Sequence, residues 1–149
     1  MGYKCTEADH TVFIHTGNSI ITIIILYVDD FSITGNNTNQ ILWDKEELKK
    51  HYNMTDLGEI SWILGIHVTQ DRKAGWIALS QEKYIGKILE CFGMSDACPI
   101  TTPTLANEHL IKLSSPEIDA KSYQCALGTL MYPMLRTRPD LTYSVTTLG

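Results

Sequence analysis

A nine-residue run rich in β-branched side chains, Ile20 to Val28, ends directly at two adjacent carboxylates, Asp29 and Asp30. Such a run favours a strand that packs against other elements. The next residues, Phe31 to Thr34, are also strand-like, and Gly35-Asn36 marks the turn that follows them. The pattern therefore predicts an antiparallel hairpin that carries both acids at its tip.

The paired acids allow two interpretations. Two negative charges this close repel each other, and removing them from water is costly. A hard divalent cation, which prefers oxygen ligands, would relieve that repulsion. Asp is also common in turns that simply face water, because its side chain bonds to nearby backbone groups. Spacing alone leaves both the metal site and the solvent-facing turn open.

Composition limits what the chain can be. With 149 residues and 44% hydrophobic side chains, it can form an ordinary domain with a buried core. Its net charge of −5 opposes a self-sufficient nucleic-acid-binding domain, which usually has a basic face. The four cysteines, Cys5, Cys91, Cys98 and Cys125, show no zinc-ligand spacing, which favours free, buried thiols.

The sequence shows neither a membrane span nor a secretion signal. The apolar run is nine residues long, whereas a membrane-spanning helix needs roughly 20. The first residues lack the apolar stretch of a signal peptide. We therefore expect an intracellular protein, in the cytoplasm or nucleus, with reduced cysteines and no membrane association.

Residue periodicity predicts an α+β fold, with antiparallel hairpins and a packing helix first and a mainly helical part second. The expected strands span residues 11–15, 20–28, 31–34, 60–70 and 76–79. One expected helix spans 39–52 after an Asn37 or Thr38 cap, a second begins after a Ser80 cap and ends at Gly93, and helical segments cover 119–135 and 140–149. Pro133 lies inside the third of these helices and should kink or break it.

Several short motifs follow one another in a familiar order. They are Glu7-Ala8-Asp9-His10, Leu26-Tyr27-Val28-Asp29-Asp30, Asp56-Leu57-Gly58-Glu59, Leu64-Gly65-Ile66, Leu79-Ser80-Gln81, Lys83-Tyr84-Ile85, Gly128-Thr129-Leu130-Met131-Tyr132 and Thr137-Arg138-Pro139-Asp140. This succession resembles the reverse transcriptase of copia-type LTR retrotransposons, and it extends over essentially the whole chain. The ordered set is far more specific than the Tyr-x-Asp-Asp box alone.

The resemblance implies part of a right-handed polymerase. Residues 1–79 would form the rear half of the palm with its primer-grip hairpin, and residues 80–149 a thumb-like helical region with a Pro-containing connector at 95–117. The implied activity is that of an RNA-directed DNA polymerase, in which a primer 3′-hydroxyl attacks a deoxynucleoside triphosphate on a template–primer. Two Mg²⁺ ions assist this nucleotidyl transfer.

The resemblance also assigns roles at the tip of the first hairpin. Asp29 would be a principal Mg²⁺ ligand and a catalytic residue, with Asp30 assisting it. Tyr27 and Val28 would lie under the primer terminus and the incoming nucleotide.

Further roles follow for the second part of the chain. Leu64, Gly65 and Ile66 would form the primer grip, where Gly lets the primer approach the backbone, although Leu64 and Ile66 also suit plain strand core. Lys83 and Lys87 are either phosphate contacts or a solvated helix face.

The family's metal site includes a third carboxylate on an earlier palm strand. Only 28 residues precede Asp29, and the acids among them, Glu7 and Asp9, match a different family segment. We therefore expect the fingers and the third carboxylate to be missing and the chain to be inactive alone. The alternatives are a retained, non-catalytic module that binds partners or self-associates through an exposed strand edge, and a small metal-binding domain without polymerase ancestry.

Overall fold

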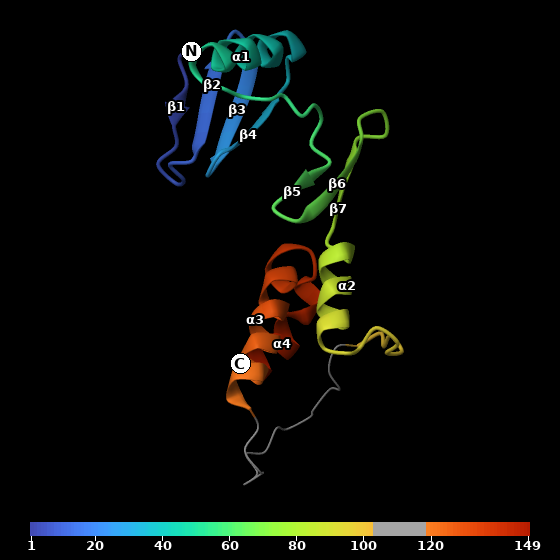
Figure 1. Cartoon of the computed structure of the whole chain (residues 1–149). Helices are drawn as coiled ribbons and strands as arrows, with labels where there is room; N and C mark the ends of the chain where they lie inside the picture. Colours follow the sequence, from blue (N-terminus) through green and yellow to red (C-terminus); the bar gives the residue numbers. More distant parts are fainter. Residues whose placement is uncertain (103–118) are drawn as a thin grey trace. The chain divides into compact units, whose positions relative to one another are not determined.

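The computed structural model describes residues 1–102 and 119–149. The chain divides into two compact units, Met1–Ile60 and Ser61–Gly149, each of which is described by itself. Both units contain antiparallel strands and helices (Figure 1), which confirms the predicted α+β class. The predicted division at residues 79 and 80 concerns palm and thumb-like regions, and it stays a prediction.

The first unit is a four-stranded antiparallel sheet with one helix on it. The strands are β1 (Lys4–Cys5), β2 (Val12–Gly17), β3 (Ile20–Tyr27) and β4 (Asp30–Gly35), in the spatial order β1-β2-β3-β4. Helix α1 (Thr38–His51) lies across one face of this sheet (Figure 1). Of the two predicted cap residues, Asn37 is the one that caps this helix, and its side chain accepts a hydrogen bond of 3.1 Å from the Gln40 amide.

Side chains of β3 alternate between the two faces of the sheet. Thr22 and Ile24 are buried on the face that α1 covers, together with Leu48 of the helix. Ile21 and Ile25 point to the opposite face and are exposed. We call the face opposite α1 the open face.

A buried carboxylate stands between α1 and the sheet. Asp44 is fully buried, and its two oxygens accept hydrogen bonds from the Tyr3 hydroxyl (2.6 Å) and the Gln40 side-chain amide (3.2 Å). Burial and the hydrogen bond to Asp44 raise the pKa of Tyr3 well above its usual range. Tyr3 therefore stays protonated and serves as the donor that this carboxylate requires.

The second unit combines a three-stranded sheet with a group of helices. Its strands are β5 (Trp62–Ile63), β6 (Ile66–Asp71) and β7 (Trp76–Ser80), and its helices are α2 (Glu82–Cys91), α3 (Ala120–Arg136), the 3₁₀ turn η1 (Pro139–Leu141) and α4 (Thr142–Leu148).

The prediction of one strand over residues 60–70 is wrong, because a turn at Leu64-Gly65 divides it into β5 and β6. The predicted cap of α2 is also displaced by one residue, since Gln81 is the cap position, although the Ser80 hydroxyl still accepts from the Glu82 amide.

Helix α3 continues through Pro133 to Arg136, so of the two outcomes expected there, a kink or a break, the break does not occur. Proline has no N–H to donate to the carbonyl of Thr129, four residues earlier. The Tyr84 hydroxyl of α2 donates to that carbonyl instead, at 3.2 Å. A partner from a neighbouring helix thus replaces the hydrogen bond that Pro133 removes.

Three further expectations can be compared with the described residues. Cys5, Cys91, Cys98 and Cys125 are free but exposed, so their predicted burial is wrong. Residues 95–102 of the expected connector contain neither helix nor strand, and its remainder lies outside the described residues. Among the helices in the described ranges, none is long and apolar enough to cross a membrane.

Candidate active site

The tip of the β3–β4 hairpin has a strained backbone. The two strands pair in register from Thr22 and Gly35 down to Tyr27 and Asp30, which leaves Val28 and Asp29 as a two-residue turn. Val28 has a φ of 57°, a conformation that β-branched residues rarely adopt. It is also 84% exposed, so packing does not explain its presence. Strain of this kind persists mainly where function requires a fixed geometry.

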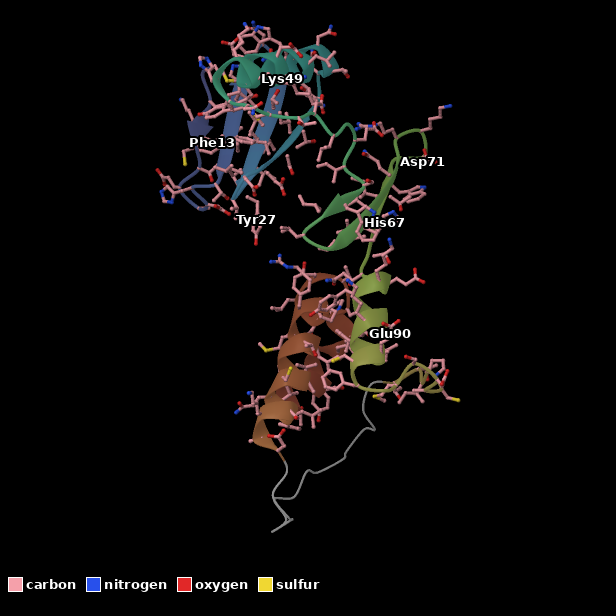
Figure 2. All side chains as sticks on the ribbon, viewed as in Figure 1. Phe13, Tyr27, Lys49, His67, Asp71 and Glu90 are labelled. Atoms are coloured by element: carbon pink, nitrogen blue, oxygen red, sulfur yellow. The ribbon has the colours of Figure 1, made fainter. Side chains whose placement is uncertain are left out.

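Both acids lie at this tip, as predicted. Asp29 belongs to the turn itself, whereas Asp30 begins β4 as the cross-strand partner of Tyr27. Because cross-strand partners share a face, Asp30 and Tyr27 project on the open face. Figure 2 shows Tyr27 at the end of the sheet that carries this tip. Both carboxylates are exposed and accessible to an ion or a phosphate.

The two carboxylates fit a hard divalent cation in chemistry, because such cations prefer oxygen ligands. They do not form a complete cage. Within residues 1–102 and 119–149, no three His, Cys, Asp or Glu side chains come together as a metal-binding group. The expectation that the third carboxylate of the family's metal site is missing stays a prediction.

The second predicted site, Leu64-Gly65-Ile66, is the tip of the β5–β6 hairpin. Leu64 and Gly65 have φ values of 51° and 75°, the pattern of a type I′ turn. Leu64 is exposed in this turn, whereas Ile66 begins β6 and is buried. Of the two interpretations, strand core therefore describes Ile66, whereas Leu64 is exposed and available for contact.

An aromatic cluster flanks this second tip. Trp62 and His67 are cross-strand partners with ring centroids 4.7 Å apart, and the Lys83 ammonium lies 4.6 Å from the Trp62 ring centroid. Lys83 and Lys87 are both exposed on α2, and Lys83 contacts an aromatic ring. Figure 2 shows His67 on β6. The sequence reasoning missed Trp62 and His67, although a two-residue turn at Leu64-Gly65 would have paired them.

Tyr132 of α3 was also missed as a site residue. Its hydroxyl donates to the backbone carbonyl of Leu64, which is 68 positions away in the chain. Its ring meets the Tyr84 ring edge to face, with centroids 5.2 Å apart and an interplanar angle of 82°. Only the folded structure brings these three residues together.

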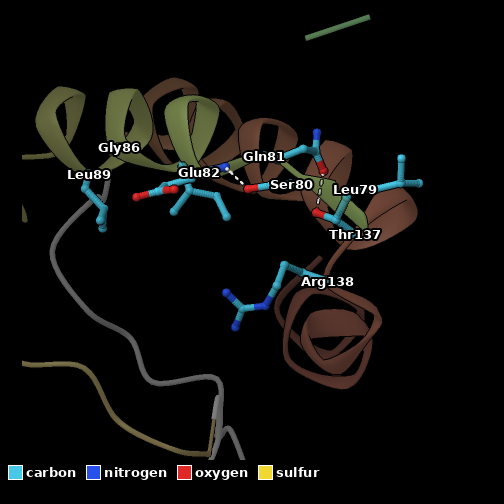
Figure 3. Close-up of a pocket in the computed structure, with 9 residues that line it drawn as sticks. Leu79, Ser80, Gln81, Glu82, Gly86, Leu89, Thr137 and Arg138 are labelled. Carbon is cyan, nitrogen blue, oxygen red and sulfur yellow. Dashed lines mark hydrogen bonds between the residues drawn. The ribbon is translucent and has the colours of Figure 1, made fainter. Parts of the chain in front are cut away.

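A hollow of about 380 Å³ lies beside the start of α2 (Figure 3). The buried Gln81 forms part of its wall, and its side-chain carbonyl accepts a 2.7 Å hydrogen bond from the Thr137 hydroxyl. Arg138 also lines the hollow and forms a two-point ion pair with Asp140. None of the predicted site residues lines this hollow.

Comparison with known proteins identifies relatives of the whole chain. Residues 1–106 match the family model described as reverse transcriptase (RNA-dependent DNA polymerase). The chain is 39% identical over 152 residues to a retrovirus-related Pol polyprotein from transposon TNT 1-94 of Nicotiana tabacum, an alignment covering 96% of this chain and 11% of that protein. It is 30% identical to the corresponding polyprotein from transposon RE1 of Arabidopsis thaliana, covering 100% of this chain and 10% of that protein.

A shorter relative is the putative transposon Ty5-1 protein of Saccharomyces cerevisiae, which is 29% identical over 100% of this chain and 48% of its own length. This chain therefore spans between about a tenth and a half of the length of these curated relatives. No solved structure matches the chain significantly.

Proposed function

Since the chain belongs to the reverse transcriptase family of RNA-dependent DNA polymerases, we propose that it supplies the metal-binding hairpin and the primer grip of a retrotransposon enzyme. In this proposal the β1–β4 sheet with α1 is the rear half of the palm, and the β5–β6 hairpin is the primer grip. Helices α2, α3 and α4 form the thumb-like region.

The observation that carries the proposal is the pair of exposed carboxylates on a strained hairpin tip. Asp29 and Asp30 would hold Mg²⁺, which supplies charge neutralisation at the phosphates and lowers the pKa of a bound hydroxyl. Tyr27, on the same face as Asp30, would support the primer terminus. Leu64 and Gly65 would contact the primer backbone, because an exposed turn with one Gly allows close approach.

The proposed metal site needs a ligand from outside the described residues. Strand β4 is the last strand in the described sheet, and its outer edge carries backbone groups available to another strand. We propose that a segment with the third carboxylate pairs along this edge. The chain alone would then bind the ion weakly, at about millimolar concentration, and would not extend a primer.

A second candidate function is a non-catalytic, self-associating module. It is favoured by the same β4 edge together with apolar side chains on the open face, since Ile21, Ile25 and Tyr27 are 48%, 40% and 53% exposed. Sedimentation at increasing protein concentration would detect self-association, and a Ser32→Lys substitution on β4 should abolish it by placing a charge beside the edge. A monomer at all concentrations would reject this candidate.

Metal binding by the chain itself tests the first proposal. Mn²⁺ accepts the same oxygen ligands as Mg²⁺ and broadens the NMR signals of nearby amides. We expect broadening centred on residues 27–31 that Mg²⁺ reverses, that Asp29→Asn removes, and that the control Asp96→Asn at an exposed position leaves unchanged. Broadening that persists in Asp29→Asn would reject the assigned site.

A further inference from the structure

The tip of the β5–β6 hairpin adopts a conformation that its sequence does not favour. A type I′ turn needs positive φ at both central residues, and Leu64 has a φ of 51° although leucine rarely occupies that region. Asn-Gly would form the same turn without this strain. A contact from outside the hairpin would stabilise this geometry of the tip.

Tyr132 provides that contact from another element. Its hydroxyl donates to the carbonyl of Leu64, the strained residue itself. Because a carbonyl direction follows the backbone dihedral angles on either side of it, this hydrogen bond selects among the orientations of the turn. Tyr132 lies on α3, so the tip is coupled to a helix and not only to its own hairpin.

The position of Tyr132 is itself fixed by two groups. The Tyr84 ring of α2 meets the Tyr132 ring edge to face, and the Tyr84 hydroxyl donates to the Thr129 carbonyl. That carbonyl is free because Pro133 has no N–H. Because Pro133 leaves the Thr129 carbonyl without its helical donor, the Tyr84 hydroxyl can bond to the helix turn from which Tyr132 projects. The contact between the two rings then restricts the position of Tyr132.

From this chain of contacts we infer that Tyr132 is a positioning residue for the Leu64-Gly65 tip, and that Tyr84 and Pro133 act through it. The inference rests on the proposed function in one respect, namely that this tip contacts the primer strand. Through Leu64, the thumb-like helix α3 would then set the geometry with which the tip meets a nucleic-acid backbone.

Two measurements on the intact 149-residue chain test this inference. Amide hydrogen exchange over residues 61–69 reports the order of the hairpin. Fluorescence anisotropy with a labelled DNA primer annealed to an RNA template reports binding. Tyr132→Phe keeps the ring and removes only the donor. Tyr123→Phe is the matched control, because Tyr123 also lies on α3 and its hydroxyl donates to a backbone carbonyl, that of Leu148, at 2.6 Å.

We expect Tyr132→Phe to speed exchange in the hairpin by about threefold to tenfold and to weaken primer–template binding by a similar factor, because one neutral hydrogen bond is lost. Tyr84→Phe should speed exchange less, and Tyr123→Phe should change neither quantity. Unchanged exchange in Tyr132→Phe would overturn the inference. Faster exchange with unchanged affinity would overturn the role of Tyr132 in primer contact.

The proposed function can fail separately. If the unsubstituted chain shows no primer–template binding, the primer-grip assignment is rejected. The exchange data then still decide whether Tyr132 positions the tip, since they require no nucleic acid.

Discussion

The phenol of Tyr3 donates a 2.6 Å hydrogen bond to Asp44, which is fully buried between α1 and the sheet. A buried carboxylate without donors is strongly destabilising, so this contact ties the N-terminal residues to α1. The Tyr3–Asp44 pair is not part of the hairpin tip. It stabilises the sheet that carries the tip.

Replacing Tyr3 with Phe should destabilise the protein by about 2 kcal/mol, because the buried Asp44 side chain loses one of its two hydrogen-bond donors. Chemical unfolding with urea would measure this loss. Tyr143→Phe, at an exposed position, is the control and should change stability by less than about 0.5 kcal/mol. Equal effects of the two substitutions would contradict the role of Tyr3.

The same pair predicts a pH dependence with a definite sign. The pKa of Tyr3 is raised above its ordinary value of 10.0, so the folded state binds this proton more tightly than the unfolded state. The stabilisation is therefore complete below about pH 10 and is lost as the pH rises above that value. In Tyr3→Phe, the part of the stability loss at alkaline pH that comes from Tyr3 should disappear. Urea unfolding curves measured between about pH 8 and about pH 11 would test this.

Substituting Leu64 with Asn should stabilise the chain by about 0.5 to 1 kcal/mol, because Asn tolerates positive φ and Asn-Gly suits a type I′ turn. Under the proposed function the same substitution should weaken primer–template binding. Thermal unfolding and anisotropy would measure the two effects. Leu57→Asn at an exposed loop position is the control and should change neither. A stability loss in Leu64→Asn would show that the turn is not strained.

A double-mutant cycle tests the connection between Tyr84 and Pro133. Tyr84→Phe should cost about 1 kcal/mol in the native background, where its hydroxyl satisfies the Thr129 carbonyl. In a Pro133→Ala background that carbonyl regains a helical donor, so Tyr84→Phe should cost less than half as much. Urea unfolding of the four proteins would give the coupling energy, and strict additivity would refute the connection.

Lys83 and Lys87 are a natural matched pair on α2. Lys83→Met removes a cation from the face of Trp62 and should destabilise the chain by about 0.5 to 1 kcal/mol. Lys87→Met, at an exposed position, should be close to neutral. Urea unfolding of both variants would measure the difference. If the two variants unfold alike, the Lys83–Trp62 contact does not contribute.

Much of the first unit could be predicted from local patterns. The β-branched run of β3 and the turn signal after Thr34 located the hairpin, and Asn37 located the start of α1, because these features depend on neighbouring residues only. The ordered motifs likewise predicted a copia-type retrotransposon reverse transcriptase, and the family match confirms it.

What the sequence did not reveal depends on contacts between distant residues. The alternation of Leu64, Ile66 and Val68 suggested one strand, whereas a turn with positive φ at Leu64 interrupts it. Pro133 suggested a kinked or broken helix, yet α3 continues past it. The sequence pattern could not show this, because the compensating donor, Tyr84, comes from another element. The Tyr132 contact to Leu64 spans 68 positions and has no local signal.

The central claim is that Asp29 and Asp30 belong to the catalytic metal site of a polymerase. Its most direct test is primer extension by a chimera in which this chain replaces the aligned segment of the tobacco Pol polyprotein. With Mg²⁺, the chimera should extend a DNA primer on RNA, Asp29→Asn should lower the rate at least about a hundredfold, and Asp96→Asn should not. Extension that survives Asp29→Asn, or an inactive chimera beside an active tobacco parent, would contradict the claim.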